Sequence, residues 1–143
     1  MSRLTINEFP QGGFSDEIIV KSSDFTGESA GAETISYSIP AGTAVIAAGV
    51  QVITPFSGGS LSAVTLDVGD GADADGYIDL MNVFTGGDTF DYNSGDLVDG
   101  TTSNFKLYTS ADTIDLDFTS AGDGLANATA GEVKVSLSLV RLG

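Results

Sequence analysis

Apolar and polar residues alternate with a period of two in four separate stretches of the chain. In residues 33–39, Ile35, Tyr37 and Ile39 alternate with small polar residues. The same alternation occurs in residues 61–68, 112–119 and 132–139. Successive side chains of a β-strand point to opposite faces, so each stretch is predicted as a strand with one buried and one solvated face.

Residues 44–56 are apolar more continuously. Their length would suit a helix, but Gly49, several β-branched residues and the Thr54-Pro55 pair favour a strand with a bend or bulge near residues 47–49. Less regular segments complete the prediction. Residues 17–21 and 105–108 are predicted as strands, residues 77–83 as a short strand or one helical turn, and residues 4–9 as a strand or an arm.

Turn residues separate these strands at intervals of about ten residues. Of the 143 residues, 19 are Gly, and many of these adjoin Asp, Ser or another Gly. No stretch of ten residues carries an apolar stripe with the 3.6-residue period of a helix. The pattern predicts an all-β fold: an antiparallel β-sandwich of about eight to ten strands, either jelly-roll-like or another Greek key.

The first 30 residues differ in character, because they are mostly small and polar with three widely spaced phenylalanines. We predict an extended N-terminal arm over residues 1–30 and a single sandwich domain over residues 31–143. Phe9, Phe14 and Phe25 are the candidate anchors of this arm. Two interpretations stay open: the rings contact a neighbouring protein such as a capsid subunit, or they pack on the chain's own sandwich.

Charge narrows the choice of partner. Twenty acidic residues face five basic ones, which gives a net charge of −15. Nucleic-acid binding requires a basic surface that five scattered bases do not supply, and anionic membranes are disfavoured for the same reason. The longest uncharged apolar run, residues 41–56, is too short to span a bilayer. A large protein partner is expected to present a neutral or basic surface.

Candidate catalytic chemistry is sparse. The chain has no His and no Cys, which removes the commonest general base, the thiolate nucleophile and any Ser-His-Asp triad. We therefore predict a protein that is not an enzyme and that needs no cofactor.

The densest polar motif holds five carboxylates within residues 67–79. Calcium prefers six to eight oxygen ligands, which closely spaced aspartates on a Gly-rich turn can supply. The spacing departs from an EF-hand, because Gly71 and Asn82 fall where that loop needs carboxylates. A calcium loop of another kind and a plain hairpin connection with aspartates capping backbone N–H groups both stay open. The candidate calcium ligands are Asp67, Asp70, Asp73, Asp75 and Asp79.

Phe90 and Tyr92 lie in a second acidic region, the turn-rich stretch 85–104. An aromatic face beside carboxylates suits a hydroxyl-rich ligand, so both residues are candidates for carbohydrate contact. The alternative is that they anchor their own loop on the sandwich.

Three turns between residues 33 and 79 carry a resemblance to a known class of proteins. They are the Ile39-Pro-Ala-Gly42 turn, the corner at residues 54–59 and the Asp73-Ala-Asp-Gly-Tyr77 loop. With the strands around them, these turns resemble the head decoration (cement) proteins of tailed bacteriophages. The resemblance implies a virion structural protein that is made in the host cytoplasm. It implies binding to the major capsid protein on the outer surface of the head, often as a homotrimer.

Two other functions remain open from the sequence. One is a carbohydrate- or receptor-binding module of a phage tail or surface particle, with or without calcium. The other is a tail-tube or head–tail connector protein, which would assemble as a ring or tube.

Overall fold

The computed structural model describes residues 14–97 and 105–142. This part of the chain contains nine strands and two short 3-10 helices, and it has no α-helix, hence no helix that could cross a membrane. The elements are β1 (Asp16–Lys21), η2 (Ser22–Asp24), β2 (Gly31–Ile39), β3 (Thr43–Ser57), β4 (Ala63–Gly69), β5 (Ile78–Asn82), β6 (Phe90–Tyr92), β7 (Lys106–Tyr108), β8 (Asp112–Ala121), η3 (Leu125–Asn127) and β9 (Ala130–Arg141).

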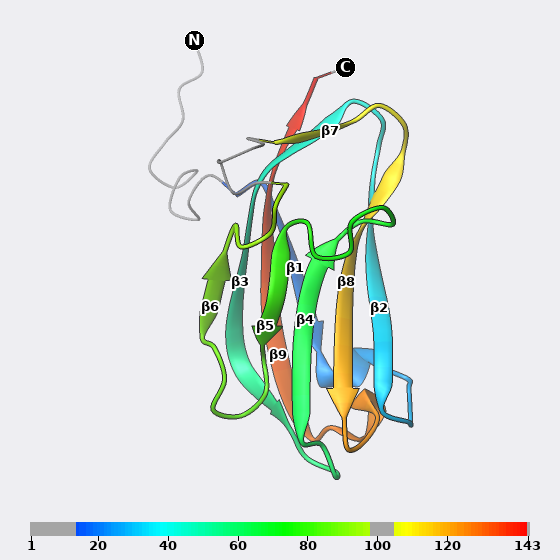
Figure 1. The fold of residues 1–143 in the computed structure, drawn as a ribbon, viewed down its shortest axis with the longest axis vertical. Helices are drawn as coiled ribbons and strands as arrows, with labels where there is room; N and C mark the ends of the chain where they lie inside the picture. The colour runs from blue at the N-terminus through cyan, green and yellow to red at the C-terminus, as the bar shows by residue number, and fades with distance from the viewer. Residues whose placement is uncertain (1–13, 98–104, 143) are drawn as a thin grey trace.

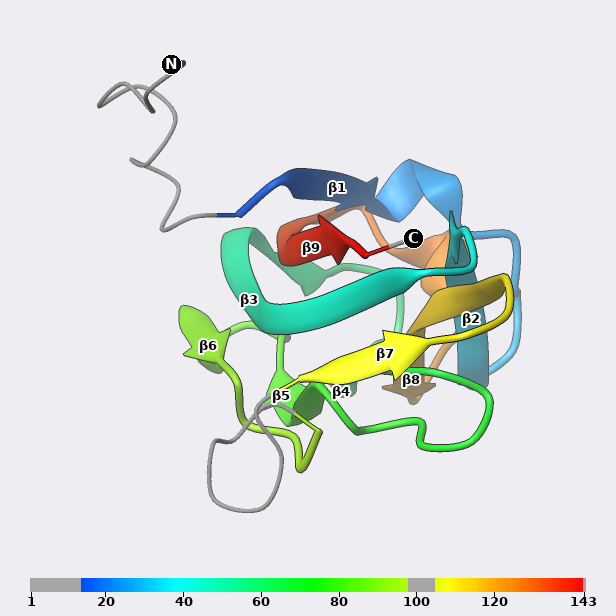
Figure 2. The same cartoon turned by 90° about the horizontal axis from the view of Figure 1, so that it is seen from above.

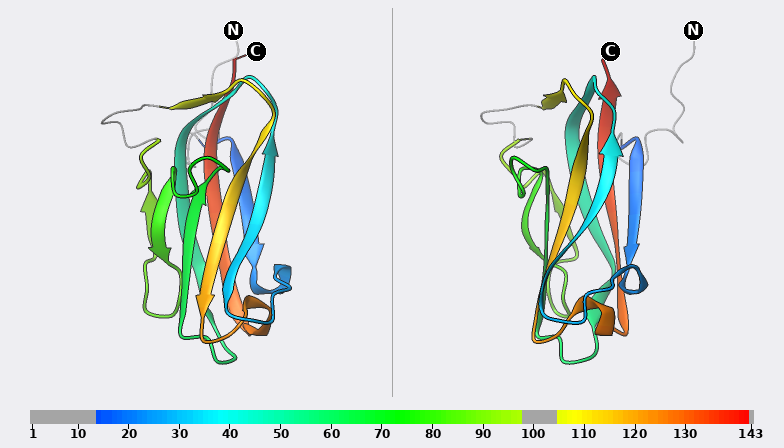
Figure 3. Two further views of the ribbon diagram at one scale, coloured as in Figure 1. Left: turned by 45° about the vertical axis from the view of Figure 1, so that its right-hand side comes forward. Right: turned by 90° about the vertical axis from the view of Figure 1, so that its right-hand side faces the viewer.

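The strands form two antiparallel sheets that pack face to face (Figures 1 and 3). Sheet A has the order β1-β9-β3-β6, with β7 also paired to β3. Sheet B has the order β2-β8-β4-β5. The predicted all-β antiparallel sandwich is confirmed.

The pairing identifies which sandwich this is. The first strand pairs with the last, β2 with β8, β3 with β6 and β4 with β5, so the pairs are nested inside one another. Successive nested pairs alternate between the two sheets. With β7 as an addition, this is the strand order of a jelly roll, the first of the two topologies predicted from the sequence.

The alternation along each strand decides which side chains enter the core. In β9, Val133, Val135 and Leu137 are fully buried between the sheets, as are the alternate apolar residues of β8. The intervening residues of both strands lie on the outer faces. Side chains of period two thus build both layers of the core without any helix.

A bulge bends β3 near its start. The register with β9 shifts between Val45 and Ala47, which leaves Ile46 without a partner residue on β9. The sequence predicts this irregularity near residues 47–49, a range that begins at Ala47, where the observed shift ends. Before the bulge, the first three residues of β3 pair with β7, which lies across the upper end of the sandwich (Figures 1 and 2).

The sandwich begins earlier than residue 31. β1 pairs in register with β9 over all six of its residues, although it lies inside the segment predicted as an arm. Phe25 is buried in the core, with its ring centroid 4.9 Å from that of Phe118 and 5.9 Å from that of Phe56. Its ring is therefore not available to a partner. Phe9, and with it the strand or arm predicted at residues 4–9, lies outside the described residues.

Candidate functional site

The outer face of sheet B is polar and acidic. Thr34 donates a hydrogen bond to the Asp117 carboxylate on the neighbouring strand, and the Ser36 hydroxyl lies 2.8 Å from the Asp115 carboxylate. Asp67 stands directly opposite Asp117. The four strands of this sheet hold six acidic residues and no basic one: Glu33, Asp67, Asp79, Asp112, Asp115 and Asp117.

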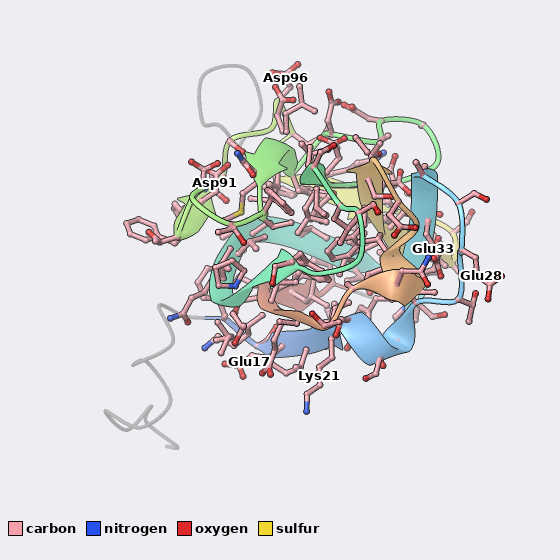
Figure 4. All side chains as sticks on the ribbon, turned by 90° about the horizontal axis from the view of Figure 1, so that it is seen from below. Glu17, Lys21, Glu28, Glu33, Asp91 and Asp96 are labelled. Carbon is pink, nitrogen blue, oxygen red and sulfur yellow. The ribbon has the colours of Figure 1, made fainter. Side chains whose placement is uncertain are left out.

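The strands of sheet A are electrically balanced. They hold four acidic and four basic residues, so their formal charges cancel. In chain order these are Asp16, Glu17, Lys21, Asp91, Lys106, Glu132, Lys134 and Arg141. Figure 4 shows Glu17 and Lys21 pointing from β1 away from the sandwich.

Exposed apolar side chains gather on the same sheet. Ten large apolar residues are exposed in the described part of the chain, and nine lie on the strands of sheet A or directly beside them. The tenth, Leu80, is on β5 of sheet B. The nine are Ile19, Ile46, Ile53, Phe90, Tyr92, Phe105, Leu107, Val140 and Leu142. Clustered exposed apolar residues mark interaction surfaces more reliably than scattered ones.

An open groove of about 500 Å³ crosses the outer face of sheet A between β1 and β6. Its floor includes Gly49 and Ser136, and its walls include Phe14, Phe90 and Tyr92. The rings of Phe14 and Tyr92 meet edge to face, with centroids 6.0 Å apart. A Cβ atom on Gly49 would lie 3.2 Å from the Phe14 ring, so glycine permits this close approach.

Charged and amide groups surround the aromatic part of this groove. Glu17 and Lys134 form a long ion pair, with 3.9 Å between Oε1 and Nζ, and Gln51 and Asp91 also line the groove. Phe90 and Tyr92, the predicted carbohydrate contacts, therefore stand together at a groove with polar neighbours, and both rings are more than half exposed.

The acidic connection between β4 and β5 is organised around Asp70. Its side chain is 1% exposed, and Oδ2 accepts hydrogen bonds from Lys106 Nζ at 2.5 Å and from the Tyr108 hydroxyl at 2.6 Å. Oδ1 accepts from the backbone N–H groups of Ala72 and Asp73. Because the Tyr108 hydroxyl has a single proton, Tyr77 must donate the 2.6 Å bond that joins the two tyrosines.

This network fixes the protonation states of its members. Burial raises the pKa of Asp70, but the hydrogen bonds from Lys106, Tyr108 and the two backbone amides outweigh burial and bring it below its ordinary value. Burial also raises the pKa of both Tyr77 and Tyr108, and the charge of Asp70 adds to that effect. The result is a carboxylate that stays charged at neutral pH and accepts four hydrogen bonds, two of which tie β7 to the β4–β5 connection.

The five candidate calcium ligands do not converge. Asp70 is engaged by Lys106 and Tyr108, and Asp67 accepts a 2.7 Å hydrogen bond from the Leu80 backbone. Across residues 14–97 and 105–142, no group of three or more acidic side chains is arranged to hold a metal ion. The hydrogen bonds to the Asp70 carboxylate are those of the alternative interpretation, a turn capped by its own aspartate.

Two of these carboxyl groups, Asp67 and Asp73, have a raised pKa to which nearby negative charge contributes. Burial raises the pKa of Asp67, with contributions from Asp75, Asp79 and Asp117, although the Leu80 amide opposes it. A hydrogen bond with Asp75 raises the pKa of Asp73. Both shifts reflect acids crowded along sheet B and its loop.

Sequence reasoning missed the contrast between the two outer faces. The signal was present in part, since Lys21, Lys106 and Lys134 lie in segments predicted as strands and Arg141 follows the last of them by two residues. The alternation does not determine which strands pair. It therefore could not predict that the strands bearing these bases belong to one sheet.

Comparison with known proteins supports the fold. No protein-family model matches the chain, and no curated protein matches it. Among solved structures, a chain in the capsid asymmetric unit of the cyanophage Pam1 superposes with a TM-score of 0.58 and 20% sequence identity, over 89% of this chain and 82% of that chain. At this level of identity the likeness establishes a shared fold.

Proposed function

We propose that this chain is a non-enzymatic structural protein of a phage virion, and that it decorates the outer surface of the head by binding the major capsid protein. The jelly-roll fold that it shares with a chain of the Pam1 capsid supports a place in the virion. The resemblance of its turns to decoration proteins supports the outer surface.

The observation that carries the proposal is the difference between the two outer faces. Sheet A joins charge balance to nine of the ten large apolar residues that are exposed in the described part of the chain, which is the composition of a protein-binding surface. The strands of sheet B hold no base, and Asp67, Asp115 and Asp117 project from their outer face, which suits contact with water. In the proposed arrangement, sheet A faces the shell and sheet B faces solvent.

The state of the buried carboxylate supports a passive role. A general acid or base needs a pKa near the working pH and a free path to substrate. Asp70 is the most deeply buried acid in the described residues, and its lowered pKa and four donors suit neither requirement.

The proposal is tested by binding to phage heads from which the protein has been removed. Adding it back is expected to restore one regular layer of density and to raise the temperature at which the heads rupture. The double variant Ile19→Ser/Ile53→Ser, on sheet A, is expected to weaken binding at least about tenfold, since each change removes exposed apolar area. Leu80→Ser, on sheet B, is the matched control and should bind normally. Heads that neither bind the protein nor gain stability would refute decoration.

Carbohydrate binding is a second candidate, favoured by the groove on sheet A. Two exposed aromatic rings beside Gln51, Asp91 and the Glu17–Lys134 pair offer both a stacking face and hydrogen-bonding groups. Titration of the protein with a panel of oligosaccharides, followed by intrinsic tyrosine fluorescence and repeated with Tyr92→Ala, tests it. Equal responses of the two proteins would exclude this groove as a sugar site.

A further inference from the structure

We propose that the free edge of β2 binds an extended segment of the partner protein, which then continues sheet B as an additional strand. The β2 edge is the backbone of Gly31–Ile39 on the side away from β8. Figure 1 shows β2 at the right-hand side of the sandwich, and the right-hand view of Figure 3 turns this side toward the reader. The inference deepens the proposed function, because the segment is assigned to the shell protein and that assignment rests on decoration.

The direction of the β2 backbone groups follows from the pairing within sheet B. In an antiparallel sheet, the N–H and C=O of one residue point to the same neighbouring strand, and those of the next residue point the other way. The Val83 N–H donates to the Val64 carbonyl at 3.0 Å, so the backbone groups of Val64 face β5 and those of Thr65 face β8. Thr65 pairs with Thr119, so the backbone groups of Thr119 face β4 and those of Phe118 face β2.

The same alternation continues into β2. Phe118 pairs with Glu33, so the backbone groups of Glu33 face β8. Gly31, two residues earlier, agrees, because its nitrogen and its carbonyl oxygen both lie 3.4 Å from Ser120 Oγ of β8. Within residues 14–97 and 105–142, no loop or side chain of another element hydrogen-bonds to the outward backbone groups of β2. The residues that direct these groups away from the sheet are all exposed: Ala32, Thr34, Ser36 and Ser38.

The other outlying strands are protected, as edge strands of natural proteins usually are. β6 and β7 have only three residues each, and three of the six residues of β1 are charged. The loop after β5 covers the edge of that strand. Ser94 Oγ accepts from the Asp79 N–H, and the Asp88 carboxylate accepts from the Asn82 N–H, both at 2.9 Å. In contrast, β2 has nine residues, a single charged residue, no Pro and an unshifted register with β8.

The inner side of β2 is also incompletely covered. Ile35 and Tyr37 pack against the core but stay half-buried. Their partners on β8, Leu116 and Ile114, are fully buried. A hollow of about 430 Å³ adjoins Tyr37 on this side of the sandwich, and residues of β1, β3 and β9 line its other walls. An added strand would place apolar side chains beside Ile35 and Tyr37 and remove more of their surface from water.

Charge selects the kind of segment that fits. The outward side chains of β2 are uncharged, but Asp115 and Asp117 of β8 lie one strand further in. They accept hydrogen bonds from the Ser36 and Thr34 hydroxyls. Neighbouring strands are about 4.8 Å apart, so an added strand runs about 10 Å from these carboxylates. Basic or neutral side chains are favoured there and acidic ones disfavoured, so a second copy of this chain, with net charge −15, is a poor donor.

The segment expected at the β2 edge alternates apolar residues, which face the core, with basic or neutral residues, which face outward. Its backbone supplies the hydrogen bonds, and its side chains supply the selectivity. Because the β2 edge lies between the two outer faces, a segment that extends from the shell can reach it while sheet A contacts the shell surface.

The edge is tested first without a shell, with the peptide acetyl-Lys-Val-Thr-Val-Lys-Val-Thr-amide as the probe. The peptide is titrated into isotopically labelled protein and followed by nuclear magnetic resonance. The amide resonances of the four outward residues of β2 are expected to shift, and their hydrogen exchange is expected to slow by about tenfold or more. The same peptide with Glu in place of Lys should bind about fivefold more weakly.

Ser36→Pro and Ser36→Ala form a matched pair of variants. Proline removes the outward N–H of residue 36 without removing a hydrogen bond to β8, whereas alanine removes only the hydroxyl that bonds to Asp115. Ser36→Pro is expected to weaken peptide binding by about tenfold or more, while Ser36→Ala binds like the wild type. Circular dichroism verifies that each variant is folded, and Thr34→Pro replaces Ser36→Pro if the latter does not fold.

Unchanged β2 resonances in the presence of the peptide would overturn the inference, as would equal peptide binding by the two Ser36 variants. A mass of the protein alone that rises with concentration, and does so less in Ser36→Pro, would assign the edge to a second copy and overturn it too.

The assignment to the shell protein is tested with stripped phage heads. Ser36→Pro should bind to them about tenfold more weakly than Ser36→Ala. Equal binding of the two variants would leave decoration intact and exclude the shell protein as the strand donor. Heads that bind no form of the protein would refute decoration, and the peptide titration would still decide whether the edge accepts a strand.

Discussion

The two sheets have equivalent inner faces and opposite outer faces. Inside, both contribute alternate aliphatic and aromatic residues to one core. Outside, sheet B exposes Thr, Ser and Asp with no base on its strands, whereas sheet A exposes apolar residues with balanced charge. The net charge of −15 is therefore not spread evenly over the molecule. A strongly acidic protein can keep one face suited to contact by confining its few bases to the strands of that face.

The same contrast separates the aspartates by role. Asp70 lies beneath β7, where Lys106 and Tyr108 hold it as a permanent carboxylate. Asp67 lies on the outer face of sheet B opposite Asp117, where burial, with a smaller contribution from like charge, raises its pKa. Residues three positions apart thus have opposite effects on stability, one as part of the structure and one as part of a repulsive surface.

The largest effect on stability is expected from a core residue, Phe25, in contrast to Phe90 on the outer face of sheet A. Phe25→Ala removes a ring that packs on Phe56 and Phe118 between the sheets, and it should lower the free energy of unfolding by about 4 kcal/mol. Phe90→Ala removes a ring that is 74% exposed, and it should change stability by less than about 0.5 kcal/mol. Urea unfolding followed by circular dichroism measures both. Comparable losses would mean that Phe90 is not a surface residue.

The next largest effect on stability is expected from the buried Asp70–Lys106 ion pair beneath β7. Asp70→Asn leaves the Lys106 ammonium without its carboxylate and should lower the free energy of unfolding by about 3 kcal/mol. For a domain of this size the melting temperature should then fall by roughly 6–12 °C. Asp79→Asn, an exposed aspartate on β5, is the matched control. A loss no greater than that of the control would show that the Asp70–Lys106 pair is not a stabilising anchor.

These residues also show what the sequence could and could not predict. Alternation located β2, β4, β8 and β9 and assigned their buried sides, because a period of two is a local property. Phe25, in contrast, lies in the segment predicted as an arm, and its burial depends on residues about 30 and 90 positions away. The Lys106–Asp70 pair spans 36 residues and joins β7 to the β4–β5 connection, so no local pattern predicts it. Long-range pairing decided these placements.

Lowering the pH should remove the contribution of Asp70 to the free energy of unfolding. The contribution of the apolar core should not change. Because the folded pKa of Asp70 lies below the unfolded value of about 3.9, its stabilisation is complete above that pH and is lost as pH falls through the folded pKa. Wild-type stability should therefore decline below about pH 4, and Asp70→Asn should show a shallower decline. Unfolding free energies measured from pH 7 to pH 2 test this. Parallel curves for the two proteins would assign the decline to other groups.

The smallest expected effect comes from the acidic outer face of sheet B. The pKa of Asp67 is raised, so its charge opposes folding at neutral pH and that penalty disappears as pH falls through the folded pKa. Asp67→Asn keeps an oxygen that accepts from the Leu80 amide and removes the charge opposite Asp117. At pH 7 the variant should be more stable than the wild type by a few tenths of a kcal/mol, after allowance for solvent screening. The gain should vanish at pH 3, where the wild-type carboxyl is also neutral. A gain that persists at pH 3 would point to packing rather than charge, and the acids of sheet B would then impose no electrostatic penalty at this position.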